Sequence, residues 1–270
     1  MRDALESWWV TLARRTRALE ASVPAICVGG ATLGGTGKTP LAIAIAKRLA
    51  AGGARVALVG HAYRAAPGRA RVVAPDDPLA EVGDEALVCA RALAGIARVV
   101  VAPRRQAAMD LAARLADVMV VDGVLQLRPR RAALSILTIH TAAPRALAAV
   151  ADVVTPVTTK MTCSIPWSAL REEPVGLVTC LARPRRVLEA LARVGVVPVA
   201  HVALPDHGPR ARAPRLSPNV RWLATEKCAL HLHAITPTTL TCEAELPTQL
   251  DQPLRAPYSP STSHFSALSA

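Results

Sequence analysis

From residue 23 onward, short apolar runs alternate with longer stretches in which apolar residues recur every three or four positions. Short apolar runs are typical of buried strands, and the longer period is typical of amphipathic helices. The pattern predicts strands over residues 23–30, 54–60, 97–103, 117–123 and 133–140, and helices over residues 38–53, 83–96 and 105–116. Strands that alternate with helices indicate parallel βαβ units, and therefore an α/β fold with a mostly parallel sheet and helices on both faces.

The alternation weakens at residues 151–172, where prolines interrupt it, and then resumes. Strands are expected over residues 174–182 and 196–204, a helix over 183–195, and a further apolar segment over 220–232. The pattern therefore predicts five parts. They are an amphipathic N-terminal helix (1–20), a first α/β domain (21–150), a linker (151–172), a second, smaller α/β domain (173–250) and a flexible tail rich in Pro and Ser (251–270).

The charge of the chain is strongly positive, with a formal net charge of +12. Such an excess favours anionic partners such as nucleotides, nucleic acids or membrane surfaces. A compositional origin is the alternative, because arginine supplies nearly all of the positive charge and alanine is abundant, as expected from a GC-rich genome. The six cysteines contain no C-x-x-C pair, which indicates neither a zinc site nor a disulfide framework and fits a reducing compartment.

The predicted N-terminal helix has a distinct composition. Trp8 and Trp9 fall near its apolar face, and Arg14, Arg15 and Arg17 lie toward the other face. Tryptophan beside arginine is typical of a membrane interface, where indole rings sit among headgroups and guanidinium groups meet phosphates. The alternative is a helix that packs its tryptophans on the protein's own core. No apolar run reaches the roughly 20 residues that a membrane span needs.

The stretch "GGATLGGTGKTP", residues 29–40, lies between a predicted strand and a predicted helix. It approaches the phosphate-binding P-loop pattern G-x-x-x-x-G-K-[ST], but Thr32 stands where the first glycine is expected. Glycines let successive backbone N–H groups turn toward an anion, and the helix that follows directs its positive end at the same place. Lys38 would neutralise nucleotide phosphates, and the Thr39 hydroxyl would ligate Mg²⁺. The predicted phosphate-binding residues are Gly34, Gly35, Thr36, Gly37, Lys38 and Thr39.

Carboxylates for metal binding and proton transfer stand at three places. Asp84 and Glu85 open a predicted helix, where acids also serve simply as N-terminal caps. Asp122 ends an apolar strand, a position at which a metal-organising Asp is expected. Asp206 and His207 follow a strand of the second domain, although a single His in a loop is usually just solvated.

Taken in order, the segments "GGTGKTP", "GHAYR", "GDE", "VVDGVLQ", "LPDH" and "LATEK" resemble the tetraacyldisaccharide 4′-kinase family. The resemblance covers roughly residues 23–232. It implies a P-loop NTPase-like first domain and transfer of the ATP γ-phosphate to the 4′-hydroxyl of a lipid A disaccharide precursor. It implies Asp84 as the catalytic base with His207 as its partner, Lys38 at the phosphates, and Thr39, Asp122 and Glu85 around Mg²⁺.

The chain departs from the family pattern at several points. Gly123 and Leu127 replace the second Asp and the His of the usual D-D-G-x-Q-H, and "TEKC" replaces T-E-K-D. A glycine-rich segment that normally follows the metal region is missing. Two alternatives therefore stay open: a degenerate member that binds nucleotide without efficient phosphoryl transfer, and an unrelated P-loop NTPase.

The resemblance also bears on location. It implies a peripheral protein on the cytoplasmic face of the bacterial inner membrane. The N-terminal Trp/Arg helix would contact the anionic lipid surface there. No nucleic-acid partner is expected, because the chain shows neither a basic groove with interleaved aromatics nor a recognised nucleic-acid motif.

Overall fold

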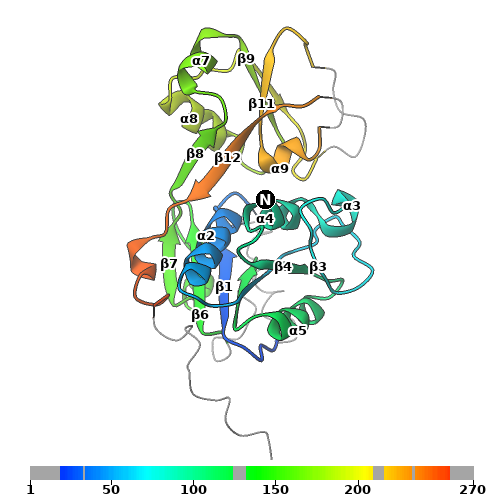
Figure 1. Ribbon diagram of the computed structural model, residues 1–270. Coiled ribbons are helices and arrows are strands. Elements are labelled where there is room, and N and C mark those ends of the chain that lie inside the picture. Colours follow the sequence, from blue (N-terminus) through cyan, green and yellow to red (C-terminus); the bar gives the residue numbers. More distant parts are fainter. Residues whose placement is uncertain (1–18, 33, 124–131, 209–215, 233–234, 256–270) are drawn as a thin grey trace, which may run out of the picture.

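The computed structural model describes residues 19–32, 34–123, 132–208, 216–232 and 235–255. These residues form two α/β lobes, stacked one above the other in Figure 1. The first lobe is built on a seven-stranded sheet and the second on a five-stranded sheet. Apart from one edge strand in each, both sheets are parallel, which confirms the predicted α/β class.

The sheet of the first lobe has the order β3-β4-β2-β5-β1-β6-β7. Its strands are β1 (Ala25–Gly30), β2 (Val56–Val59), β3 (Arg71–Val72), β4 (Arg98–Val101), β5 (Val118–Asp122), β6 (Leu134–Ile139) and β7 (Val153–Pro156). Only β3 is antiparallel to its neighbour, β4. Strand β1 lies between β5 and β6, with Val28 opposite both Asp122 and Ile136. The loop after β1 therefore leaves from the middle of the carboxyl edge of the sheet, where ligands bind in such folds.

Helices cover both faces of this sheet, as predicted. They are α2 (Lys38–Ala51), α3 (Leu79–Val82), α4 (Asp84–Ala92), α5 (Arg105–Leu115) and α6 (Arg145–Ala148). Alternate strand residues point to opposite faces. Along β1, Ile26 and Val28 belong to the core under α2 and α4, whereas Ala25 and Cys27 pack with residues of α5. The strands are therefore buried on both sides, which explains why their sequences are almost wholly apolar.

The second lobe has the sheet order β10-β9-β11-β12-β8, in which only β8 is antiparallel to its neighbour. Its strands are β8 (Thr159–Cys163), β9 (Val175–Thr179), β10 (Ala200–Ala203), β11 (Arg221–Thr225) and β12 (Thr238–Ala244), and its helices are α7 (Trp167–Glu172), α8 (Arg185–Arg193) and α9 (Glu226–Ala229). Leu177, Leu191, Leu223 and Leu240 are fully buried in its core.

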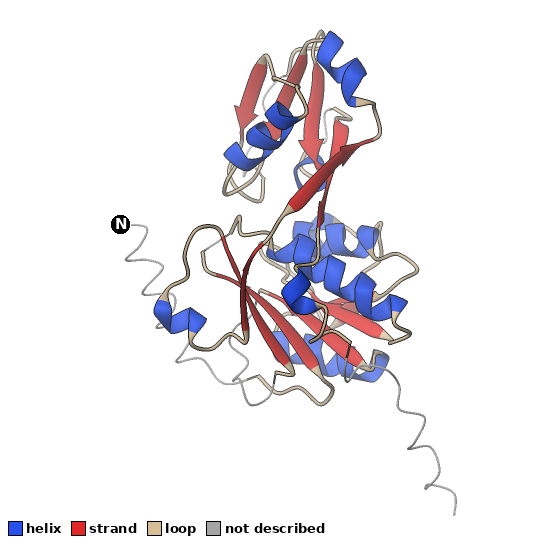
Figure 2. Ribbon diagram, turned by 90° about the vertical axis from the view of Figure 1, so that its left-hand side faces the viewer, coloured by secondary structure: helices blue, strands red, loops and turns tan. Residues whose placement is uncertain are grey.

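The predicted linker over residues 151–172 is wrong, because this segment contains β7, β8 and α7. Its prolines mark the ends of elements: Pro156 is the last residue of β7 and Pro166 precedes α7. Strand β8 pairs with β12, some eighty residues further along the chain, from Leu240↔Cys163 to Ala244↔Thr159. The two paired strands join the lobes, as Figure 2 shows from the side. A pairing partner this distant leaves no local pattern in the sequence.

The predicted tail also begins too early. After β12 the chain returns to the first lobe, where Leu250 and Leu254 are buried in the core under α2. The second domain therefore ends before residue 250, and 251–255 belong to the first lobe. The rest of the predicted tail and nearly all of the predicted N-terminal helix lie outside the described residues.

Within the residues that the structure describes, no helix combines the length and the apolar character needed to cross a bilayer.

Candidate functional site

The loop between β1 and α2 has the backbone of a phosphate cradle. Gly34, Gly35 and Gly37 adopt φ angles of 102°, 74° and 85°, a region that L-residues with side chains rarely occupy. The Thr36 side chain is buried, and its hydroxyl accepts a hydrogen bond from Thr138 on β6 at 2.7 Å. Thr36 is therefore anchored to β6 by its side chain. Helix α2 begins at Lys38 and directs its positive end toward the loop.

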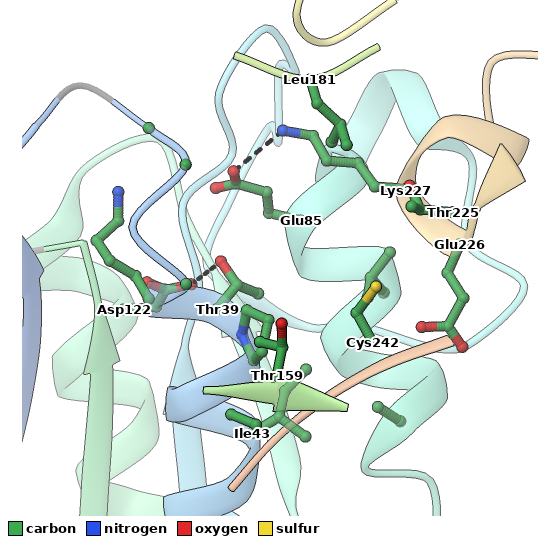
Figure 3. Close-up of a pocket in the computed structure, with 18 of the residues that line it drawn as sticks. Thr39, Ile43, Glu85, Asp122, Thr159, Leu181, Thr225, Glu226, Lys227 and Cys242 are labelled. Atoms are coloured by element: carbon green, nitrogen blue, oxygen red, sulfur yellow. Dashed lines mark hydrogen bonds and ion pairs between the residues drawn. The ribbon is translucent and has the colours of Figure 1, made fainter. Parts of the chain in front are cut away.

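Thr39 and Asp122 meet at the foot of this loop, with the Thr39 hydroxyl donating to Asp122 Oδ2 at 2.7 Å (Figure 3). Asp122 Oδ1 is buried and has no hydrogen-bond partner among the described residues. Burial raises the pKa of Asp122, and the neighbouring Glu85 carboxylate raises it further. A buried carboxylate with an unsatisfied oxygen beside a threonine hydroxyl suits a divalent cation, since Mg²⁺ is usually held by one or two carboxylates, waters and phosphates.

Asp84 is a buried carboxylate that is held by several hydrogen bonds. It opens α4 and is almost fully buried. His207 Nδ1 lies 2.9 Å from Asp84 Oδ1, His231 Nε2 lies 3.0 Å from Oδ2, and the Glu85 N–H donates to Oδ1 at 2.8 Å. Burial by itself raises the pKa of Asp84, but the hydrogen bonds from both imidazoles and the charge of Lys227 outweigh it. The pKa is therefore held well below its usual range, and Asp84 is ionised at neutral pH.

His207 reaches Asp84 because the first lobe holds its loop. The residue follows β10 in the second lobe and has a left-handed φ of 62°. The Arg64 guanidinium donates to the backbone carbonyl of Asp206 at 3.0 Å. The Tyr63 ring lies 4.5 Å from the His207 ring, measured between centroids. These contacts come from "GHAYR", so this segment positions the histidine of the other lobe.

Lys227 on α9 links the carboxylates of the two lobes. Its Nζ lies 3.2 Å from Glu85 Oε1, an ion pair visible in Figure 3, and 3.4 Å from Asp206 Oδ1. Burial lowers the pKa of Lys227, but Glu85, Asp84 and Asp206 outweigh this effect and raise it. Glu85 thus serves the ion pair with Lys227 as well as lying near Asp122. The carboxylate that was predicted to lie beside a metal therefore also forms an ion pair between the lobes.

The structure brings the predicted residues of the two lobes into one site. It also adds two residues to which sequence reasoning gave no role, Lys227 and His231. Lys227 is the last residue of the segment "LATEK", and its place in that segment could have indicated a role at the site. His231 had no signal, because its role arises only from its contact with Asp84, 147 residues away in sequence.

Gly123 has a structural reason to be glycine. Its φ is 90°, a value that would strain any L-residue, including the aspartate of the family pattern. Arg105 lies nearby, half-buried, and donates to the backbone carbonyl of Gly60 at 2.8 Å. Burial lowers the pKa of Arg105, and the negative charge of Asp122 partly offsets this effect because the two groups attract one another. In this chain an arginine, and no second aspartate, therefore lies beside Asp122 at this edge of the sheet.

Cys228 replaces the acid of T-E-K-D at the third position of α9. In that pattern the threonine caps the helix and an acid three residues on faces back toward it. Thr225 does cap α9, and its hydroxyl donates to Cys228 Sγ at 3.0 Å, while the Cys180 N–H donates to the same sulfur at 3.1 Å. Hydrogen bonding from Cys180 and Thr225 lowers the pKa of Cys228 to about 6 despite its burial. Both hydrogen bonds therefore favour negative charge on the sulfur at the position of the acid in that pattern.

A cavity of about 1150 Å³ runs between the lobes and includes the phosphate loop. Lys38, Thr39, Asp122 and Asp206 lie along its polar part. Apolar side chains from both lobes line the remainder, namely Ile43, Val88, Met161, Leu181, Leu240 and Leu246. Such a cavity is large enough for a nucleotide together with part of a second substrate. The arrangement suits phosphoryl transfer, because the phosphate cradle and Asp122 line one cavity and His207, which binds the ionised Asp84 carboxylate, lines it as well.

Comparisons with known proteins agree with this geometry. The family model described as "LpxK: Tetraacyldisaccharide-1-P 4'-kinase" matches residues 6–145, just over half of the 270-residue chain. A tetraacyldisaccharide 4′-kinase of Anaeromyxobacter sp. (strain K) is 38% identical over 133 residues, which are 47% of this chain and 35% of that protein. One from Verminephrobacter eiseniae is 28% identical over 257 residues, or 80% of this chain and 60% of that protein.

The matched region thus spans from about a third to three fifths of the length of these curated relatives. Among solved structures, LpxK from Aquifex aeolicus in complex with ATP superposes with a TM-score of 0.68. The sequence identity is 19%, and the superposition covers 93% of each chain. At this identity the likeness shows the fold alone, and it confirms the two-lobed α/β architecture.

Proposed function

We propose that the chain, which belongs to the tetraacyldisaccharide-1-P 4′-kinase family, transfers the γ-phosphate of ATP to the 4′-hydroxyl of a tetraacyl disaccharide 1-phosphate, a lipid A precursor. The observation that carries the proposal is the contact between Asp84 and His207 across the lobes. It supports the proposal because His207, which binds the ionised Asp84 carboxylate, lines the same cavity as the phosphate loop.

The phosphate loop would hold the nucleotide. Its glycine N–H groups and Lys38 bind the terminal phosphates, and the start of α2 adds its dipole. Thr39 and Asp122 would hold Mg²⁺, with Glu85 nearby, because Asp122 Oδ1 is an unsatisfied buried acceptor. Bound Mg²⁺ neutralises charge that develops on the phosphate oxygens.

Asp84 would receive the proton of the sugar hydroxyl. A carboxylate offers about four acceptor positions. His207 Nδ1 lies within hydrogen-bond distance of both Asp84 oxygens, at 2.9 and 3.0 Å, and His231 and the Glu85 N–H each bind one of them. His207 and His231 fix the orientation of the carboxylate and stabilise its charge before the reaction. The acceptor oxygen then attacks the phosphoryl group in line with the departing ADP oxygen.

The direct test is transfer of labelled γ-phosphate from ATP to a tetraacyl disaccharide 1-phosphate in detergent micelles. We expect label on the 4′-position of the acceptor, dependent on both Mg²⁺ and the disaccharide. Retained Mg·ATP binding with no transfer would overturn the proposal. That outcome would favour the second candidate, a nucleotide-binding member without kinase activity. Two departures from the family pattern support this candidate, namely Gly123 and the missing glycine-rich segment.

We further propose that the protein acts as a peripheral protein on the cytoplasmic face of the bacterial inner membrane. Its N-terminal Trp/Arg segment and net charge of +12 suit an anionic surface, and a lipid acceptor would lie there. The full chain is expected to co-sediment with vesicles that contain anionic lipid, and 0.5 M salt should weaken this binding. The double variant W8A/W9A should remain in the supernatant. Equal sedimentation of the variant and the wild type would contradict a role for the tryptophans.

A further inference from the structure

The connection from β9 to α8 in the second lobe lies directly on the phosphate loop of the first. Arg186 Nη1 donates to the backbone carbonyl of Gly35 at 2.6 Å, and its Nη2 donates to the carbonyl of Val157 at 3.3 Å. Arg183 Nη2 lies 3.4 Å from the Thr32 hydroxyl. Both arginines also line the cavity that contains Lys38 and Thr39.

The β9–α8 connection approaches the phosphate loop so closely that side chains at Gly34 and Gly35 would collide with it. A Cβ on Gly35 would lie 2.8 Å from both Cγ and Cδ of Arg183, and a Cβ on Gly34 would lie 3.1 Å from the Cβ of Ala182. The stem of Arg183 therefore packs on the part of the loop that would bend around the phosphates. Gly35 serves two purposes, since it supplies a left-handed turn and makes room for an arginine of the other lobe.

No salt bridge neutralises the charges of this contact within the part of the chain that the structure describes. Among the described residues, neither Arg183 nor Arg186 forms an ion pair with a carboxylate. Burial lowers the pKa of Arg186, and the positive charge of Arg183 lowers it further. The Glu189 carboxylate offsets part of this effect, but the two guanidinium groups placed on the anion cradle still repel one another. A phosphate would relieve that repulsion and satisfy their free N–H donors.

We propose that Arg183 is a catalytic residue supplied by the second lobe, and that its guanidinium contacts the phosphoryl group in transfer. Arg186 is a positioning residue, which holds the β9–α8 connection on the loop through the Gly35 carbonyl. The inference rests on the proposed phosphoryl transfer. Arg183 contributes no atom to the reaction: the phosphoryl group leaves the ADP oxygen and joins the acceptor oxygen, while the fork of N–H donors binds its equatorial oxygens, where charge is spread.

This role explains why the two lobes need to meet over the loop. With the β9–α8 connection in place, the nucleotide phosphates are approached by Lys38 from the first lobe and by Arg183 from the second. Phosphoryl-transfer enzymes gain about 10³- to 10⁵-fold in kcat from an arginine placed in this way. The alternative is a purely structural contact, in which Arg183 only packs on Gly35.

The test compares nucleotide affinities of the whole protein, without the lipid acceptor. Dissociation constants are measured for Mg·ADP alone and for Mg·ADP with fluoroaluminate, which mimics the phosphoryl group in transfer. Wild type should bind the fluoroaluminate complex more tightly than ADP. For Arg183→Ala we expect that gain to fall by about 10- to 100-fold, the loss typical of a hydrogen bond to a charged group, with little change in the ADP affinity.

Arg185→Ala is the matched control, because Arg185 lies two residues away, in the first turn of α8, and is exposed. It should behave as wild type. Arg183→Lys should recover only part of the fluoroaluminate gain, since an ammonium cannot bind two oxygens in parallel, and added guanidinium ion should restore part of it to Arg183→Ala. Arg186→Met should lower the gain as well, and guanidinium should not restore it.

Equal fluoroaluminate gains in Arg183→Ala and Arg185→Ala would overturn the proposal and leave a structural contact. An equal loss of affinity for ADP and for the fluoroaluminate complex would also overturn it, because it would place Arg183 on a phosphate that is not transferred. Neither result depends on the acceptor. A failure to phosphorylate the disaccharide would therefore be distinguishable from a failure of this inference.

Discussion

Asp84→Asn is expected to lower kcat for phosphoryl transfer by about 10²- to 10⁴-fold, the usual contribution of a positioned general base. The amide has nearly the shape of the carboxylate but cannot accept the hydroxyl proton. The affinity for Mg·ATP should change little, because Asp84 lies on α4 and the phosphate loop is formed by β1 and α2. Steady-state kinetics of transfer, with ATP affinity from calorimetry, separates the two effects.

The pH dependence provides a second measure of the same residue. The hydrogen bonds and charges around Asp84 hold its pKa below the usual range, so the carboxylate stays in its basic form as the pH falls from 7. Loss of kcat through protonation of Asp84 should therefore appear only below about pH 4, the ordinary value for an aspartate. A loss of kcat near pH 6 in the wild type that disappears in Asp84→Asn would contradict this assignment.

Asp117→Asn is the matched control, since Asp117 pairs with the exposed Arg55 at 2.6 Å. It should retain the kcat of the wild type. Thermal unfolding of both variants identifies any loss of fold, because Asp84 is buried among two histidines and a lysine and its substitution also affects stability. A kcat of Asp84→Asn within threefold of the wild type would exclude Asp84 as the base.

Lys38→Ala is expected to lower kcat by about 10²- to 10³-fold, as is typical when one preorganised positive donor is removed from a transition state. It should also weaken ATP binding more than ADP binding, since the side chain would serve the terminal phosphates. Lys38 begins α2, and its stem lies against Gly30 at the end of β1, where an added Cβ would be 2.9 Å from Lys38 Cδ. The contact with Gly30 therefore keeps the Lys38 side chain beside the phosphate loop.

Lys160→Ala offers a matched control, because Lys160 is an exposed lysine on β8 in the other lobe. The affinities for ATP and ADP, measured alongside transfer rates, should be unchanged in this variant. Unaltered ATP affinity and kcat in Lys38→Ala would be incompatible with a phosphate-binding loop at Gly34–Thr39.

The phosphate loop and the first lobe were largely predictable because their signals are local. Apolar runs and helical periods mark β1, α2, α4 and α5 to within a few residues, and the glycines at 34, 35 and 37 indicate the left-handed turns that the structure contains. These features depend on side-chain period and backbone freedom, which neighbouring residues determine. The sequence also placed Asp122 at the end of a strand, where the structure has it.

The tertiary structure alone decided the rest, because those features depend on contacts between distant segments. Strand β8 was mistaken for part of a linker, since its partner β12 lies far along the chain. Asp84 meets His207 and His231 across 123 and 147 residues, and Arg183 reaches the phosphate loop across 151. The sequence by itself therefore determined which residues carry charge and which elements bear them. Only the packing of the two lobes determined which charges meet, because the free energy of that packing is spread over many apolar contacts that no short motif records.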